Sequence, residues 1–140
     1  MKALVQRVSR AAVRVDGAVV GEIGPGLLVL LGVGHDDDEA VADRVADKLR
    51  ALRIFPDADG RMNEPLGDRE VLCVSQFTLM ADTRKGNRPS YVAAAEPERA
   101  NALYERVCDR LGAQRGVFGA HMEVDLVNDG PVTLLIEYGP

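Results

Sequence analysis

An unbroken apolar run limits the folds open to this chain more than any other feature of its sequence. Residues 27–33 read LLVLLGV and carry no polar side chain. The run has the length of one strand and falls far short of the ~20 apolar residues that a membrane-spanning helix needs. Such composition is typical of a central strand covered on both faces. We therefore expect a sheet with other elements packed on each side of it.

Further strands are predicted from the alternation of apolar and polar residues. Asp16-Gly17 supplies the positive φ angles of a tight hairpin turn. A second buried strand runs directly into residues 75–79, and an ordinary turn at 128–131 precedes the last strand. The expected strands are residues 4–8, 12–15, 18–23, 71–74, 122–126 and 132–138.

Two helices complete the predicted fold. Apolar residues recur along 41–52 at helical spacing, after the acidic residues 36–38 that suit a helix N-terminus. The second helix has Pro97 in its first turn and ends at Gly112. Residues 56–60 are predicted to form a turn and 81–89 a polar loop. The expected fold class is α+β, a single compact domain over 1–140 with a mixed, mostly antiparallel sheet and two principal helices.

The charge balance argues against a protein that binds nucleic acid indiscriminately. The chain has 17 Lys and Arg against 22 Asp and Glu, a net charge of −5, whereas nonspecific binding depends on an excess of cations. An RNA partner would have to be held by a small local patch of basic side chains.

Cys73 and Cys108 lie in apolar segments without metal-ligand spacing, and the first residues are unlike a signal peptide. Both observations favour a cytoplasmic protein with reduced cysteines.

Standard catalytic sets are missing from the sequence. His35 and His121 are far apart and lack a serine elbow or HExxH spacing, so we expect both to be exposed residues without a catalytic role. The acidic run 36–39 superficially resembles a cation site, but capping of the following helix is the commoner explanation.

Two short segments are the best candidates for a site. Residues 75–79, SQFTL, place polar side chains at the end of a buried strand, where backbone donors become free to meet a ligand. The alternative is a strand edge satisfied by its own hydroxyls. Residues 128–133, NDGPVT, are explained by an ordinary turn, and a cis Gly-Pro bond would be the exception.

The chain resembles the D-aminoacyl-tRNA deacylases over its whole length. The pair SQFTL and NDGPVT at this separation is highly specific for that family. Two departures are minor: the segment 65–70 is shorter than usual, and Met80 stands where an aromatic residue is frequent. The matching stretches are residues 1–17, 21–33, 52–63, 74–90 and 118–137.

The resemblance implies a deacylase-type fold and a homodimer with active sites at the subunit interface. Gly130 and Pro131 would be joined by a cis bond and enter the partner's site beside Phe77. Their carbonyl oxygens would hold the substrate's α-amino group and leave no space for an L side chain. A D side chain would point to solvent, and glycine would not be rejected. Asn128 is implied to bind substrate in the same segment, and Arg7 to brace it.

The implied reaction is hydrolysis of the ester between a D-amino acid and the terminal adenosine of tRNA. Because no side chain offers a general base, the resemblance implies that catalysis rests on positioning, on the RNA's free ribose hydroxyl and on protein donors. The candidate catalytic residues are Ser75, Gln76, Phe77 and Thr78. We assign the donor to the Phe77 backbone N–H and substrate orientation to Ser75 and Gln76. Thr78 has no base beside it, which favours a structural or binding role.

A basic loop is the expected contact with RNA. Arg84, Lys85 and Arg88 fall within five residues and would meet phosphates near the acceptor end, although a solvated loop explains them equally. No metal or organic cofactor is implied. Two other functions stay open: editing of a mischarged L-amino acid, as in domains attached to threonyl-tRNA synthetases, and a non-catalytic RNA-binding or interaction dimer.

Overall fold

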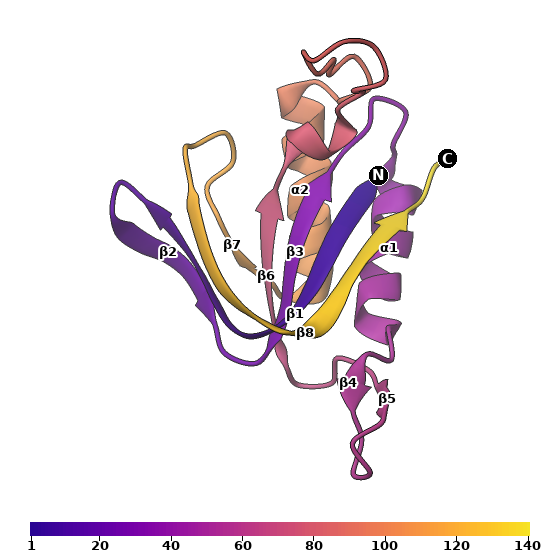
Figure 1. Cartoon of the computed structure of the whole chain (residues 1–140). Coiled ribbons are helices and arrows are strands. Elements are labelled where there is room, and N and C mark those ends of the chain that lie inside the picture. The colour runs from indigo at the N-terminus through magenta and orange to yellow at the C-terminus, as the bar shows by residue number, and fades with distance from the viewer.

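The computed structural model describes residues 1–140, in which one strongly bent sheet is backed by two helices (Figure 1). The sequence prediction of a mixed, mostly antiparallel sheet with two principal helices is confirmed. None of the helices combines the length and apolar character needed to cross a membrane. The elements are β1 (Lys2–Val15), β2 (Ala18–Ile23), β3 (Gly26–Gly32), α1 (Glu39–Ala51), β4 (Phe55–Pro56), β5 (Met62–Glu64), β6 (Glu70–Ser75), the 3-10 helix η1 (Phe77–Met80), α2 (Pro97–Leu111), β7 (Gln114–Arg115) and β8 (Glu123–Glu137).

Strand β1 organises the sheet. Its first half pairs antiparallel with β3 and its second half with β2, while β8 pairs antiparallel with both halves. Strands β6 and β7 extend the sheet from β3 in parallel. The sheet bends where β1 passes from β3 to β2, and α1 and α2 cover only one of the resulting arms (Figure 1).

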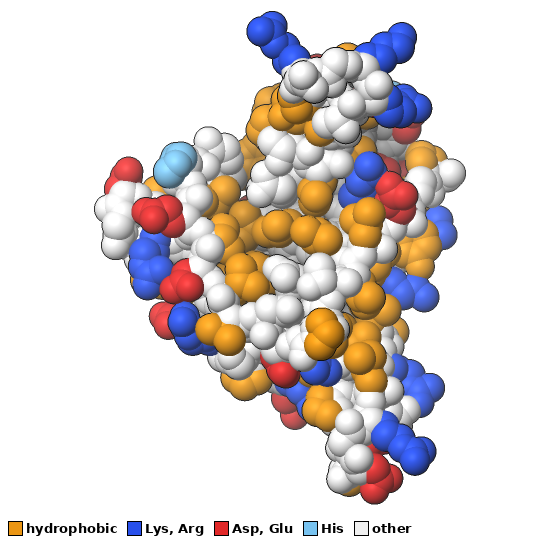
Figure 2. Space-filling model, viewed as in Figure 1, with side chains coloured by type: hydrophobic (Ala, Val, Ile, Leu, Met, Phe, Trp, Pro, Cys, Tyr) orange, Lys and Arg blue, Asp and Glu red, His pale blue; other side chains and the backbone are white.

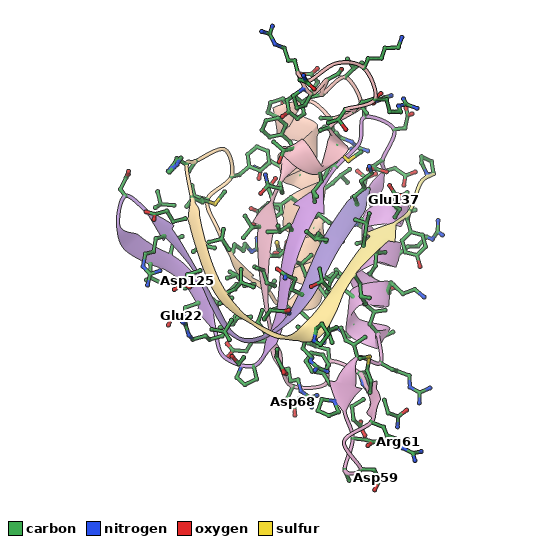
Figure 3. All side chains as sticks on the ribbon, in the orientation of Figure 1. Glu22, Asp59, Arg61, Asp68, Asp125 and Glu137 are labelled. Carbon is green, nitrogen blue, oxygen red and sulfur yellow. The ribbon has the colours of Figure 1, made fainter.

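The ends of several elements differ from the sequence prediction. Residues 4–8 and 12–15 form one continuous strand, because β8 pairs along the whole of β1. The turn expected at 128–131 is instead a bulge within β8, and the strand pairs antiparallel with β1 on both sides of it. The turn at 56–60 lies in a small hairpin of β4 and β5 that was not predicted. In Figure 3, Asp59 and Arg61 project from this hairpin away from the rest of the molecule.

Strand β3 is covered on both faces, as its sequence indicated. Leu27, Val29 and Leu31 are fully buried against the helices in the larger hydrophobic core. Leu28 points the other way, into a smaller core within the bend of the sheet. Both cysteines are free and buried, as expected.

The acidic run before α1 is structural. Asp38 caps the helix by accepting a hydrogen bond from the Val41 N–H (2.9 Å). Asp37 is buried and forms an ion pair with the α-amino group of Met1 (2.7 Å). Further along, the carboxylates of Asp43 and Asp47 pair with arginines of α2. No cluster of potential metal ligands is present.

The shortened segment 65–70 has a defined path. Leu66 is inserted into the larger core, and Gly67 makes the following turn with a φ of 58°. The segment therefore connects β5 to β6 without a longer loop.

Candidate active site

The turn that follows β6 is anchored to the neighbouring strand β3. Ser75 lies opposite Leu31, and the Gln76 N–H donates to the Leu31 carbonyl (2.8 Å). Gly32 lets the turn approach, because a Cβ there would lie 2.9 Å from the Leu79 Cβ and 3.1 Å from the Gln76 carbonyl oxygen. Residues 75–79 thus leave the strand for a short helix at a fixed position.

Two backbone donors are left free at this turn. The first hydrogen bond of η1 runs from the Leu79 N–H to the Gln76 carbonyl (3.2 Å). The N–H groups of Phe77 and Thr78 precede it and therefore have no acceptor within the helix. Neither takes part in the hydrogen bonds made by turns and loops. They can stabilise negative charge on a ligand oxygen.

A pocket of about 610 Å³ opens beside the free N–H groups. It lies between the end of β6, the start of α2 and the segment that leads into β8, and Figure 2 shows apolar side chains in the hollow at the centre of the molecule. The ring of Phe77 is half exposed and packs edge-on against Tyr91, with 5.1 Å between ring centroids. The lining residues are Val33, Val74, Ser75, Gln76, Phe77, Tyr91, Ala94, Ala95, Glu96, Pro97, Ala100, Phe118, Gly119, Ala120, His121, Met122 and Val124.

The pocket offers no activated nucleophile. The Gln76 side-chain amide donates to the Thr78 hydroxyl oxygen, and no general base contacts that hydroxyl. Cys73 lies behind the turn, and hydrogen bonding with Cys108 together with burial raises the pKa of its thiol well above the usual range. His35 is outside the pocket, with Nδ1 3.0 Å from the Ala93 carbonyl oxygen.

The sequence did not identify the rest of the pocket wall. Tyr91, Glu96, Phe118 and His121 all line it, so the expectation of a merely exposed His121 is incomplete. None of these four residues belongs to SQFTL or NDGPVT. Only the fold brings them to the turn.

The second motif forms the bulge in β8. Asn128 pairs with Val8 and Thr133 with Gln6, so residues 129–132 leave the ladder opposite Arg7. Gly130 and Pro131 are exposed and joined by a cis bond, as the family resemblance implied.

Arg7 holds this bulge in place. Its Nε donates to the Asp129 carbonyl (3.0 Å) and forms an ion pair with the Asp129 carboxylate (3.2 Å). Its NH1 donates to the Ile54 carbonyl (2.6 Å). These contacts are those expected of a residue that braces the bulge.

The two motifs do not meet within one chain. The bulge lies opposite Arg7, which pairs with Leu27, whereas Ser75 is level with Leu31. The offset is about 13 Å along the strands, and three strand spacings add about 14 Å across them. In Figure 3, Asp125 and Glu137 mark the two halves of β8 on either side of the bulge, which lies at the opposite end of the sheet from η1. No residue of 128–133 lines the pocket.

The basic loop has fewer free cations than the sequence suggested. The Arg84 guanidinium makes paired hydrogen bonds with the Asp82 carboxylate (2.9 and 2.7 Å) and lowers the pKa of Asp82 to about 2. Lys85 and Arg88 are exposed and form no ion pair. The free cations of this loop are therefore Lys85 and Arg88.

Comparison with known families finds one match over almost the whole chain. Residues 4–137 match the family model described as D-Tyr-tRNA(Tyr) deacylase. A D-aminoacyl-tRNA deacylase of Anaeromyxobacter dehalogenans is 60% identical, over 98% of this chain and 97% of the relative. One from Symbiobacterium thermophilum is 54% identical, over 98% and 95% respectively.

Solved structures with similar folds were also found. The c-Myc DNA unwinding element binding protein superposes with a TM-score of 0.94 at 38% identity and covers 100% of both chains. A probable eukaryotic D-amino acid tRNA deacylase gives a TM-score of 0.83 at 16% identity, over 96% of this chain and 97% of that one. The second likeness concerns the fold alone.

Proposed function

This chain belongs to the D-aminoacyl-tRNA deacylase family, and we propose that it catalyses the family's reaction in the pocket beside Phe77. The enzyme is a hydrolase that releases D-amino acids from tRNA and so proofreads chirality in translation. The location is supported by Phe77, which lines the pocket and has a free backbone N–H, with the free N–H of Thr78 next to it in the chain. We place the enzyme in the cytoplasm, where reduced Cys73 and Cys108 are expected to persist.

The pocket is suited to the terminal nucleoside of tRNA. Its volume of about 610 Å³ lies within the roughly 300–1,000 Å³ typical of small-molecule sites. Phe77, Tyr91 and Phe118 provide aromatic surface for a base, and stacking of bases on aromatic rings is a common mode of RNA binding. With the adenosine there, the ester would reach the turn at Ser75.

Catalysis is proposed to rest on positioning and backbone donors. The carbonyl oxygen of the ester gains negative charge as water attacks, and the Phe77 N–H can stabilise it. Ser75 and Gln76 orient the substrate. Glu96 and His121 line the pocket but form no hydrogen bond with the turn at 75–78. We therefore assign part of the proton transfer to the ribose hydroxyl beside the ester.

A second copy of the chain is proposed to complete each site. Gly130 and Pro131 lie too far from Phe77 to act beside it in the same chain, but a two-fold dimer brings the bulge of one chain to the pocket of the other. The face between the two motifs supports this arrangement. Leu4 pairs with Leu30 on one side and with Leu135 on the other, and Leu135 is 57% exposed. Such an apolar row is suited to burial against a partner.

Chirality is proposed to be read by the bulge of the partner. Main-chain carbonyl oxygens of Gly130 and its neighbours would hold the α-amino group of the substrate and occupy the space where an L side chain projects. Main-chain atoms make this rejection independent of which side chain is offered. Glycine has no side chain to reject, so glycyl-tRNA is also proposed as a substrate.

The direct test uses matched D- and L-tyrosyl-tRNA with the purified protein at substoichiometric concentration. We expect multiple turnovers of the D ester and no acceleration of the L ester. Equal hydrolysis of both would replace chiral proofreading with editing of a mischarged L-amino acid.

RNA binding should depend unequally on the basic loop. Lys85→Ala and Arg88→Ala should each raise KM for the charged tRNA severalfold and reduce its salt dependence by about one phosphate contact. Arg84→Ala should have a smaller effect, because Asp82 already neutralises that guanidinium. Steady-state kinetics at several salt concentrations would measure this. A larger effect of Arg84 than of Lys85 and Arg88 would contradict the assignment.

Thr78 should be dispensable for the chemistry. Its hydroxyl accepts a hydrogen bond from Gln76 and has no base to activate it, so Thr78→Ala should keep kcat within about tenfold of wild type, the loss expected from one weakened contact. Removal of a true nucleophile lowers kcat by about 10⁴-fold or more. Mass spectrometry of the quenched reaction should reveal no acyl group on Thr78. A trapped acyl-enzyme would overturn the mechanism.

A further inference from the structure

Asn128 closes the base of the bulge in β8. The backbone of Arg7 has no ladder partner on β8, because residues 129–132 leave the ladder there. The Asn128 Nδ2 donates to the Arg7 carbonyl (2.9 Å) and to the Val132 carbonyl (3.2 Å). One side-chain amide thus joins both ends of the bulge to each other and to β1, where the backbone ladder is interrupted.

The same side chain is the main neighbour that crowds residue 130 and favours glycine there. Gly130 is not among the glycines with a positive φ, so a left-handed backbone is not the reason for glycine here. A Cβ at this position would overlap the Asn128 Oδ1, and it would lie 3.0 Å from both the Asn128 Cγ and the Val132 backbone nitrogen. The space beside Gly130 is therefore occupied by an amide that two hydrogen bonds hold in place.

We propose that Asn128 is a positioning residue for the bulge, and that it sets the D-over-L selectivity of the enzyme through Gly130. This inference rests on the proposed role of the bulge in the partner's site. It revises the expectation that Asn128 binds the substrate, since its amide donors are used within the chain. Arg7 acts at a separate point, because it holds the Asp129 carbonyl. Asn128 thus fixes the two ends of the bulge, and Arg7 fixes Asp129 within it.

The sharpest single change is Asn128→Asp, which keeps the shape of the side chain but turns an oxygen toward the carbonyls of Arg7 and Val132. With both hydrogen bonds lost, kcat for D-tyrosyl-tRNA should fall about 30-fold while KM for the tRNA changes little. The ratio of D to L hydrolysis should fall with it. The matched control is Arg10→Ala, which removes an exposed contact with Asp125 in the same pair of strands and should leave both values unchanged. Wild-type kcat and selectivity in Asn128→Asp would overturn the proposal, as would losses explained entirely by unfolding or loss of the dimer.

A double-mutant cycle tests the link to Gly130. Gly130→Ala alone should be severely impaired, because its methyl group displaces the Asn128 amide. In an Asn128→Ala background the same change should cost clearly less, because only the tight contact with the Val132 backbone nitrogen remains, so the two effects should be non-additive. Additive losses would refute the coupling. The cycle can also be measured from unfolding midpoints, which do not depend on activity. A protein that shows the coupling but hydrolyses no D-aminoacyl-tRNA would refute the proposed function alone.

Discussion

A one-to-one mixture of two inactive variants of this chain should recover about a quarter of wild-type activity, because random pairing makes half of the dimers mixed and each mixed dimer has one intact site. The first variant, Phe77→Pro, removes the backbone donor at the start of η1, a position that tolerates proline. The second, Gly130→Leu, fills the space beside the bulge. As homodimers, we expect each to lose at least about 10²-fold in kcat.

Two controls make this complementation specific. Phe77→Ala removes the same ring but keeps the N–H, so it should retain more activity than Phe77→Pro. Adding Leu135→Arg to both variants places a charge on the proposed interface, where Leu135 is 57% exposed, and should abolish the recovery. The chains must be co-refolded so that subunits exchange, and light scattering should report dimers. A mixture as inactive as its parents, or a fully active monomer, would show that one chain holds a complete site.

The sheet was predictable because its strands carry strong periodic signals. The run 27–33 became β3, and the stripes along 41–52 and 97–111 became the two helices. β4, β5 and β7 span at most three residues each, which is too short for periodicity to reveal. The bulge was taken for a turn because Asn-Asp-Gly-Pro is turn chemistry. Pairing of both halves of β8 with β1 continues the strand through the bulge instead of reversing it.

The candidate site could be predicted only in part from the sequence, because part of it is assembled by tertiary packing. The turn at 75–79 and the bulge at 128–133 have distinctive residues, and the turn lines a pocket while the bulge lies away from it. The pocket wall comes from Tyr91, Glu96, Phe118 and His121, whose positions depend on how α2 and the approach to β8 pack against β6. The pairing of Arg84 with Asp82 could not be predicted from the sequence either, because a charge count does not show which charges neutralise one another.

D-Aminoacyl-tRNA that ends in 2′-deoxyadenosine should bind normally but hydrolyse about 10²–10⁴-fold more slowly, the usual contribution of a group that assists proton transfer. The expectation follows from the chemistry of the pocket. Thr78 is bonded to Gln76 without a base, and Cys73 is buried with a raised pKa. No metal-ligand cluster exists among the residues of the chain. The proposed mechanism therefore assigns the proton relay to the ribose hydroxyl next to the ester.

His121 makes the test of this last prediction more demanding, because it lines the pocket and is the side chain there best suited to replace the ribose hydroxyl. If the hydroxyl carries the proton, His121→Ala should change kcat by less than about tenfold, an effect far below the loss of a general base. His35→Ala should keep the wild-type kcat, because His35 lies outside the pocket.

Chelators should leave the rate unchanged. Single-turnover rates at saturating enzyme would separate chemistry from binding. Full turnover of the deoxy substrate, combined with collapse of the rate in His121→Ala, would transfer the proton-relay role from the RNA to the protein.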